Sequence, residues 1–532
     1  MDDLKIVLYM CNWGPHAAFQ ALQDAGADIP PQVRMIRIPC TGRMSKALLF
    51  KAFEMGADGV ALIGCEPGSC RYGSGTLVAE RNVEDTRGIL DLLGLGGDRL
   101  RLAMFLPEES DALLLFLKDF CNVIRTIGPS PVTPVVRRPS QPIERRALAQ
   151  VLTAHDIYAC QDCGKCSSAC PLALAGKPFS PRALANAVIG GGLPPSAGET
   201  EGPSAGVWSC LTCGLCYDRC PSAVDFPDFI RDVRALQKKA GQCGPEAHGG
   251  FFQSLMRTMT SPGLSVRHWD WLPDGIRTRA DSRILFFGGC APYLDTYFKP
   301  HLGVQTSDIL VDSLKLLNFF DIEPALLPNE RCCGHDLLWS GDRENFLELA
   351  RLNVEAMQKT GVEEVVTACP ECYRTLAHDY PEQGVELPFK VTHLYELIEN
   401  EIAKGAVGFD NLPHVLTYQD SCRLSRLDGR PDLPRKLLKR LQAEDFHEMR
   451  DRGASALCCG NCSWTGCDSY TKAMQVARLR QARETGSDLL VTSCPKCQIH
   501  LRCAMEDPVD GDAIRVEMAD LISLLARTIR WE

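Results

Sequence analysis

The chain has 532 residues, of which 45% are hydrophobic and 23% charged, as is ordinary for a protein of several folded domains. Its net charge of −10 and pI of about 5.7 argue against a general nucleic-acid-binding protein, which would carry a basic patch or tail. The sequence contains no run of about 18 uncharged apolar residues, so no membrane span is predicted. The N-terminus lacks a signal-peptide pattern, and we expect a cytoplasmic protein.

The 27 cysteines are the unusual feature of the composition. In a short secreted chain they would predict disulfide bonds, but this chain is long and its cysteine count is odd. A cytoplasmic protein keeps its thiols reduced, and most of these cysteines stand in compact groups of two to four. We therefore expect the cysteines to bind metal.

Short apolar runs alternate with helical patterns across residues 1–128, and this alternation predicts a parallel α/β sheet. The apolar runs cover residues 6–10, 35–38, 60–63 and 102–105, with helical patterns near 45–55 and 111–127. Cys11, Cys40 and Cys65 each follow a predicted strand, and Cys70 lies one turn further on. Because the carboxyl ends of parallel strands meet at one sheet edge, we expect these thiols to converge. Ordinary buried cysteines are the alternative.

A Pro-rich linker is predicted over residues 129–147, and residues 148–240 then contain two dense cysteine runs among helical segments. Three thiols at two-residue spacing hold one 4Fe–4S cubane, and a fourth cysteine before a proline reaches the neighbouring cluster. A pair of structural zinc sites is the alternative. The long helical stretch between the runs favours a helical two-cluster ferredoxin module over the compact βαβ ferredoxin. The predicted ligands are Cys160, Cys163, Cys166 and Cys220 for one cubane, and Cys210, Cys213, Cys216 and Cys170 for the other.

After a connector over residues 241–281, the sequence repeats itself in residues 282–400 and 414–532, which predicts two tandem α/β domains. Each copy has a lone cysteine, a Cys-Cys-Gly triplet and a Cys-Pro-x-Cys motif. Strand-like runs precede the lone cysteine and the last motif, so the loops should converge at the carboxyl edge of a sheet. Zinc and a redox disulfide are alternatives, although adjacent cysteines rarely bridge each other. The five thiols are Cys290, Cys332, Cys333, Cys369 and Cys372 in the first copy, and Cys422, Cys458, Cys459, Cys494 and Cys497 in the second.

With these motifs, residues 150–530 resemble the C and B subunits of heterodisulfide reductase, fused in that order as in the D-type form of the enzyme. The resemblance implies that each Cys-Cys-Gly repeat binds a noncubane 4Fe–4S cluster through its five cysteines. It also implies that the two clusters face each other and cleave a disulfide, so that these ten cysteines are the catalytic set. The family pattern does not explain Cys462 or Cys467. His335 is either a proton donor near the first cluster or a capping or packing residue.

The N-terminal domain resembles the delta subunit of methyl-viologen-reducing hydrogenase. The resemblance lies in Cys11-Asn-Trp, Cys40-Thr-Gly-Arg and the stretch Gly64-Cys-Glu-Pro-Gly-Ser-Cys70. It implies one 2Fe–2S cluster, held here by Cys11, Cys40, Cys65 and Cys70, and electron exchange with a flavin-bearing protein. Gly14 stands where many relatives have a further cysteine.

Together these features predict an iron–sulfur protein of a heterodisulfide reductase-like complex, which relays electrons to or from a disulfide or thiol site at paired noncubane clusters. The sequence has no Gly-x-Gly-x-x-Gly motif after a strand, so we expect no FAD or NAD bound to this chain. The implied partners are a flavin-bearing heterodisulfide reductase A-type protein, a hydrogenase, formate dehydrogenase or NADH-oxidising protein, and a disulfide or thiol substrate. The alternative is an electron relay for a hydroxy-acid dehydrogenase, without a substrate of its own.

Overall fold

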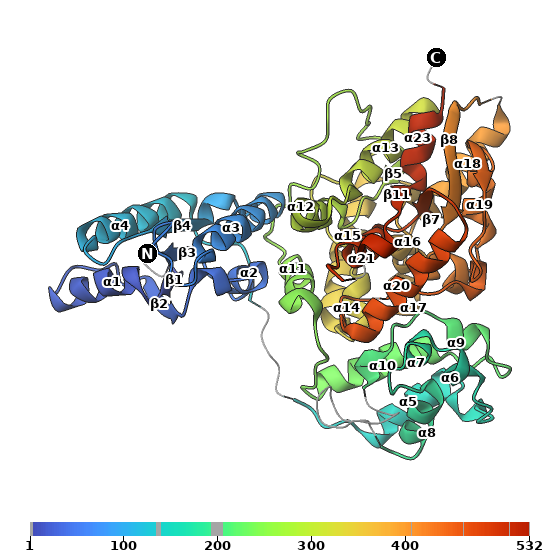
Figure 1. The fold of residues 1–532 in the computed structure, drawn as a ribbon, viewed down its shortest axis with the longest axis horizontal. Helices are drawn as coiled ribbons and strands as arrows, with labels where there is room; N and C mark the ends of the chain where they lie inside the picture. The colour runs from blue at the N-terminus through green and yellow to red at the C-terminus, as the bar shows by residue number, and fades with distance from the viewer. Residues whose placement is uncertain are drawn as a thin grey trace. The chain divides into compact units, whose positions relative to one another are not determined.

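The computed structural model describes residues 4–134, 140–192, 206–405, 407–460, 462–509 and 511–530. Part of the predicted Pro-rich linker, residues 135–139, lies outside the described residues. The chain forms two compact units, and it leaves the first unit and later returns to it. The first unit comprises Met1–Arg137 and His248–Asp270, and the second comprises Arg138–Ala247 and Trp271–Glu532. Parallel sheets with many helices confirm the predicted multidomain α/β class (Figure 1).

The first unit is built on a four-stranded parallel sheet with the order β2-β1-β3-β4. The central strand β3 is buried along its whole length, as its uninterrupted apolar run requires. Helices α1 and α4 pack together against one face, and α2 and α3 pack together on the other. The bounds are β1 Ile6–Cys11, α1 Gly14–Asp24, β2 Val33–Ile38, α2 Lys46–Glu54, β3 Gly59–Gly64, α3 Gly75–Leu92, β4 Leu100–Met104 and α4 Ser110–Ile127.

The predicted connector 241–281 is divided between the two units. Its central part contains helix α11, Phe251–Thr258, which packs on α2 in the first unit. The rings of Phe251 and Phe50 lie 5.2 Å apart. Beside them, Glu54 Oε1 lies 2.7 Å from Arg257 Nε, and the Glu54 side chain is 3% exposed. The segment is therefore held by apolar contact and by a buried ion pair.

The second unit begins with the helical module. Its longest helix, α10, starts after Asp225, whose side chain accepts a hydrogen bond from the Asp228 amide as an N-cap. Helix α10 packs on α5, and the two cysteine runs lie in the loops and short helices around this pair. The bounds are α5 Arg145–Ala154, α6 Lys165–Ala169, α7 Pro171–Leu174, α8 Pro181–Ile189, α9 Leu215–Asp218 and α10 Phe226–Lys239.

The first repeat has a three-stranded parallel sheet with the order β5-β6-β7. Cys290 follows β5 and Cys369 follows its neighbour β6, so both cysteines lie at the carboxyl edge. The bounds are β5 Ile284–Phe286, α12 Ala291–Leu302, α13 Thr306–Phe319, α14 His335–Trp339, α15 Arg343–Thr360, β6 Glu364–Thr367, α16 Pro370–Arg374, α17 Tyr380–Glu382, β7 Lys390–His393 and α18 Leu394–Lys404.

The second repeat has a four-stranded parallel sheet with the order β11-β10-β8-β9. Here Cys422 follows β8 and Cys494 follows its neighbour β10, which reproduces the placement in the first repeat. The bounds are β8 Asn411–Tyr418, α19 Asp432–Leu438, β9 Gln442–Phe446, α20 Ser469–Glu484, β10 Leu489–Thr492, α21 Pro495–Met505, α22 Gly511–Ile514, β11 Glu517–Asp520 and α23 Leu521–Thr528.

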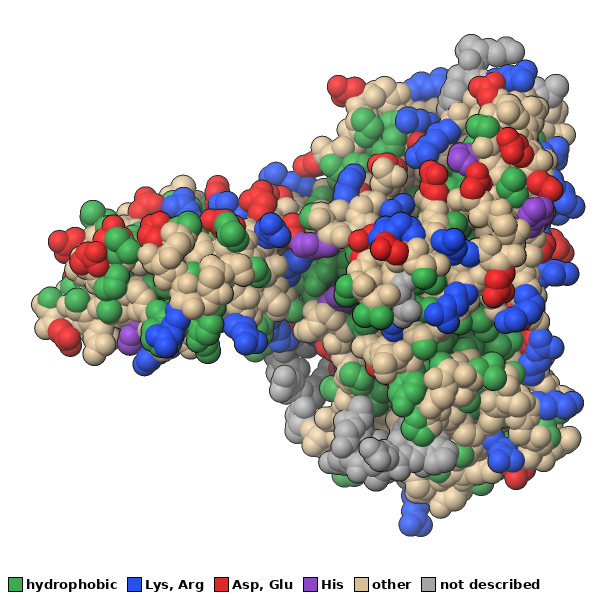
Figure 2. Space-filling view, in the orientation of Figure 1, with side chains coloured by type: hydrophobic (Ala, Val, Ile, Leu, Met, Phe, Trp, Pro, Cys, Tyr) green, Lys and Arg blue, Asp and Glu red, His purple; other side chains and the backbone are tan. Residues whose placement is uncertain are grey.

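The surface carries charges of both signs, interspersed on the face that Figure 2 shows. Among the helices that the structure describes, none is both long enough and apolar enough to cross a bilayer.

The ion pair between Glu54 and Arg257 leads to a prediction about how firmly α11 is attached to the first unit. Burial alone would raise the pKa of Glu54, but Arg257 and hydrogen bonds from Lys51 and Ser254 outweigh burial and hold the pKa below its usual range. The ionised Glu54 carboxylate therefore stabilises the fold above roughly pH 4.3, and this stabilisation declines as the pH falls below that value. Glu54→Gln should weaken attachment of α11 by about 3 kcal/mol, because it removes the carboxylate that neutralises the largely buried Arg257 guanidinium.

Limited proteolysis at pH 7 measures this effect as faster cleavage between residues 241 and 281. The exposed Glu84 on α3 provides the control, since Glu84→Gln removes the same charge from a solvated position. Equal cleavage rates in Glu54→Gln and the wild type would contradict the prediction.

Candidate metal centres

The four cysteines singled out in the first unit lie close together. The sulfur atoms of Cys11 and Cys65 are 3.6 Å apart. The thiols of Cys40 and Cys70 form a second pair, which packs against Gly75 at the start of α3. A Cβ atom at Gly75 would lie 2.6 Å from Cys40 Sγ and 2.9 Å from Cys70 Sγ, so only glycine permits this approach. The donor set fits a 2Fe–2S cluster, which takes four thiolates.

Gly14 borders the same site. A Cβ atom added there would lie 3.9 Å from Cys65 Sγ. A cysteine at this position would therefore lie beside the Cys65 thiol, and the chain keeps four sulfur donors without it.

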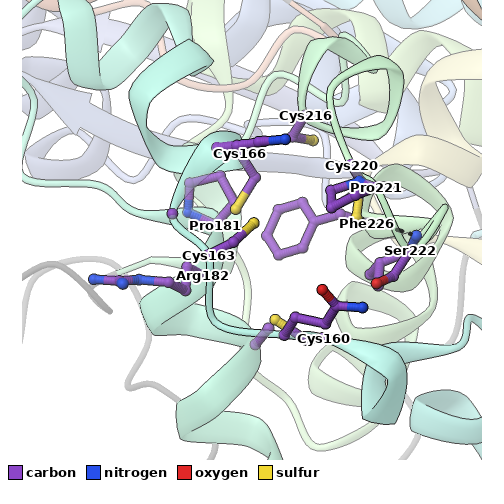
Figure 3. A pocket seen from close by; sticks show the side chains of 15 residues that line it. Cys160, Cys163, Cys166, Pro181, Arg182, Cys216, Cys220, Pro221, Ser222 and Phe226 are labelled. Atoms are coloured by element: carbon purple, nitrogen blue, oxygen red, sulfur yellow. Dashed lines mark hydrogen bonds between the residues drawn. The ribbon is translucent and has the colours of Figure 1, made fainter.

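The first cavity of the helical module brings together cysteines from both runs. Sulfur atoms of Cys160, Cys163 and Cys166 point into it, and the Phe226 ring borders it (Figure 3). Cys220, the last cysteine of the second run, lines the same cavity from the opposite side. Cys216 lines this cavity as well as the second one, so the four cysteines predicted for one cubane lie together beside a cysteine predicted for the other.

The second cavity is lined by Cys210, Cys213, Cys216 and, from the first run, Cys170. Burial raises the pKa of Cys210 to about 12 and that of Cys170 to about 11. Thiols this reluctant to ionise become thiolates when a metal binds them and supplies the opposing charge. Buried sulfur donors among apolar walls therefore fit an iron–sulfur cluster.

The two cysteine runs also share a backbone conformation. Asp162 and Gly164 in the first run have φ of 53° and 77°, and Thr212 and Gly214 in the second have φ of 45° and 81°. These left-handed residues turn the chain between successive cysteines, which directs three side chains to one point. Asp162 and Thr212 adopt a conformation that costs a non-glycine residue energy, as is common at binding sites.

In the first Cys-Cys-Gly repeat, five thiols form a chain of hydrogen-bonded neighbours in the order Cys290, Cys332, Cys333, Cys372, Cys369. In the second repeat the order is Cys422, Cys458, Cys459, Cys497, Cys494. The matching order means that the two sites have the same internal layout. Hydrogen bonds from the neighbouring thiols lower the pKa of Cys333 to about 7 and that of Cys459 to about 6. Five converging sulfur atoms suit a cluster that uses more ligands than a cubane.

Three families of known proteins match separate parts of the chain. The family described as methyl-viologen-reducing hydrogenase, delta subunit, matches residues 6–128, a 4Fe–4S dicluster domain matches 156–224, and the cysteine-rich domain matches 284–377 and 416–502. The D subunit of the dihydromethanophenazine:CoB–CoM heterodisulfide reductase of Methanosarcina acetivorans is 30% identical over 318 residues, which is 58% of this chain and 74% of the relative. The chain belongs to the family of heterodisulfide reductase D subunits.

Two further relatives match smaller shares of this heterodisulfide reductase-type chain. The iron-sulfur D subunit of the vhu F420-non-reducing hydrogenase of Methanocaldococcus jannaschii is 31% identical over 24% of this chain and 97% of its own length. A probable glycolate oxidase iron-sulfur subunit of Bacillus subtilis is 28% identical over 45% of this chain and 54% of its own. With the thiol sites described above, these relationships make the protein an iron–sulfur electron relay of the heterodisulfide reductase type.

In this heterodisulfide reductase-type chain, the second cavity of the helical module lies against the second repeat. Cys422 and Cys458 share one apolar core with Cys210 and Cys213. Arg426 Nε donates to the Cys213 carbonyl oxygen at 2.8 Å.

Arg423, which follows Cys422 and is 1% exposed, connects three parts of the unit. Its Nε donates to His335 Nε2 at 3.0 Å, and its Nη1 donates to the Thr212 carbonyl oxygen at 2.6 Å. Its Nη2 lies 3.0 Å from Thr212 Oγ1 and 2.9 Å from Cys462 Sγ. A guanidinium has donors and no acceptor. Arg423 therefore ties the ferredoxin loop to His335 of the first repeat and Cys462 of the second.

A second buried cation, Lys496, completes the network. Its ammonium lies 2.6 Å from Glu371 Oε2 and bonds Asp336 as well. His335 Nδ1 lies 3.0 Å from Asp336 Oδ1. Because His335 Nε2 accepts a bond from Arg423, its Nδ1 carries a proton and donates to Asp336. Both ring nitrogens of His335 are thus engaged, which favours the packing interpretation of this residue over that of a free proton donor.

Sequence reasoning named His335 and Cys462 without assigning them, and it missed Arg423, Glu371 and Lys496. A signal was present, because Glu371 and Lys496 occupy the same variable position of the two Cys-Pro-x-Cys motifs with opposite charges. The other unassigned cysteines are dispersed: Cys121 lies in the core of the first unit, Cys243 and Cys467 are exposed, and Cys503 is half-buried.

The exchanged ligand arrangement is tested by Cys220→Ser. This change should remove about four of an expected 18 or so iron atoms per chain, because one cubane loses a thiolate. Iron analysis of anaerobically purified protein measures it, and Cys121→Ser, at a buried cysteine outside every motif, should keep the full content. Full iron in Cys220→Ser, or stoichiometric zinc in place of iron in the wild type, would show that the sites are of another kind.

Proposed function

We propose that this chain is the iron–sulfur component of an oxidoreductase complex and that its two Cys-Cys-Gly repeats together cleave or form a disulfide. The observation that carries this proposal is the complete set of five converging thiols in both repeats, with the same internal order. An electron relay alone would be served by four thiols per cluster. Two complete five-thiol sites in one compact unit instead suit a substrate with two sulfur atoms.

The overall reaction balances as a disulfide, two electrons and two protons giving two thiols, and it can run in either direction. Noncubane 4Fe–4S clusters, when bound by the ten cysteines of the repeats, would supply stored electrons and an iron atom for each substrate sulfur. The chain's own contribution is placement. The paired parallel sheets present the thiols at their carboxyl edges, while Arg423 and Lys496 hold the repeats together between the two sites.

The remaining thiol sets suit an electron path. We assign two cubane 4Fe–4S clusters to the helical module and a 2Fe–2S cluster to Cys11, Cys40, Cys65 and Cys70. The first unit would exchange electrons with a flavin-bearing partner of the heterodisulfide reductase A type, supplied by a hydrogenase, a formate dehydrogenase or an NADH-oxidising protein. Reduced thiols in such numbers suit the cytoplasm.

A second candidate is an electron relay for a hydroxy-acid dehydrogenase. The similarity to a probable glycolate oxidase iron-sulfur subunit favours it, but that match is lower in identity and in coverage than the match to the heterodisulfide reductase relative. Iron–sulfur proteins of that class often lack some of the five cysteines, whereas both repeats here keep all of them.

The proposal predicts that the two repeats act as one catalytic unit. Cys333→Ser and Cys459→Ser should each abolish disulfide reduction, and the double variant should be no worse, because groups that act together behave non-additively. Activity with a reduced viologen dye as donor measures this, and electron paramagnetic resonance should show the cubane signals intact in all three proteins. Substantial activity in either single variant would favour the relay alternative.

A further inference from the structure

The two Cys-Pro-x-Cys motifs meet through their variable residues. Glu371 stands between Cys369 and Cys372, and Lys496 stands between Cys494 and Cys497. The Lys496 ammonium reaches across to Glu371, 2.6 Å away, so each site's ligand loop holds one end of a salt bridge. The side chains of Lys496 and Glu371 are 6% and 12% exposed.

We propose that Lys496 is a positioning residue for the metal site of the other repeat. Its ammonium fixes the two ligand loops against each other, and its charge sets the reduction potential of the first-repeat site. The inference rests on the proposed function, since it takes the five thiols of each repeat as cluster ligands.

The ion bridge is asymmetric. Lys496 comes from the second repeat, but both of its carboxylate partners, Asp336 and Glu371, come from the first. It also lies close enough to the Cys290 thiol to act on it electrostatically. The second repeat has its own cation, Arg423, beside Cys422. Each lone cysteine therefore has a buried positive charge nearby. For Cys290 of the first repeat, that charge belongs to Lys496 of the second repeat.

The charge of Lys496 should be felt strongly at this position. The residue is 4% exposed, and the Trp464 ring lies 5.3 Å from the ammonium. Solvent and salt screen charges much less at such a site than at the surface. Adding an electron to the first-repeat site adds negative charge beside Asp336 and Glu371. Without Lys496 the two carboxylates would lose the cation that bonds both of them, and reduction would become harder.

Two simpler interpretations explain less. The ligand atoms of His335, Asp336 and Glu371 lie within 4.8 Å of one another, a spacing that could suit a metal ion. The chain's own ammonium already bonds both carboxylates there, so the cation of this cluster is Lys496. A role in stability alone would not explain the charges at these positions. A buried ion pair often stabilises a protein no more than apolar residues of similar size would.

The test uses the full chain with its clusters, purified anaerobically, and a redox titration followed by electron paramagnetic resonance. The signal absent from Cys333→Ser identifies the first-repeat site. Lys496→Met should lower its reduction potential, because a positive charge is lost. Glu371→Gln should raise it, because a negative charge is lost. Lys496→Arg should stay near the wild-type value, and so should the control Lys404→Met, whose side chain is 68% exposed.

Shifts of opposite sign in Lys496→Met and Glu371→Gln support the inference, since loss of a merely structural salt bridge would move both variants the same way. Unchanged potentials, or shifts of one sign, overturn it. If Lys496→Met fails to bind iron at the first site, Glu371→Gln decides alone: a raised potential supports the inference and any other result rejects it. Absence of every repeat-site signal in the wild type would instead reject the proposed function.

Discussion

A charged side chain buried in a protein must be neutralised by an opposite charge or by hydrogen bonds within the protein, and this constraint holds the second unit together. The interior between the repeats contains Arg423, Lys496, Asp336 and Glu371, whose formal charges cancel. Removing such groups from water costs several kcal/mol each unless the geometry of their contacts is good. The partners come from different modules, so the charges are satisfied only when the modules are assembled. The same contacts that neutralise the charges therefore fix where the two thiol sites lie.

The need to neutralise buried charge applies equally to the thiols that would bind metal. Buried thiols such as Cys210 have a raised pKa because an isolated thiolate would be costly in their apolar surroundings. A bound cluster supplies the positive charge that makes thiolates acceptable, and its binding energy then becomes folding energy for the loops that hold it. The left-handed conformations of Asp162 and Thr212, which are unfavourable in isolation, fit such loops, because ligand binding can offset their cost.

Local features were predictable from the sequence, and contacts between distant segments were not. The strands before Cys11, Cys65 and Cys369 could be located because apolar runs ending at a cysteine are a local pattern, and the sheet rule then brings their ends together. Helix α11 was treated as part of a connector, because its apolar face has meaning only against α2, some 200 residues earlier in the chain. The roles of Arg423 and Lys496 were not predicted, since burial and partners cannot be read from one segment.

Comparing the two repeats position by position recovers part of what was missed. Duplicated domains begin with identical side chains at matched positions, and two equal charges facing each other at a buried contact would repel. Glu371 and Lys496 avoid that repulsion by carrying opposite charges at the same position. A second matched position, three residues after each Cys-Cys pair, holds Asp336 in the first repeat and Cys462 in the second. Asp336 contacts Lys496 and Cys462 contacts Arg423, so this position has also diverged, in each case to suit a cation from the second repeat. Duplication therefore supplied two similar thiol sites, and divergence at the surface between them supplied the charges that join the sites into a pair.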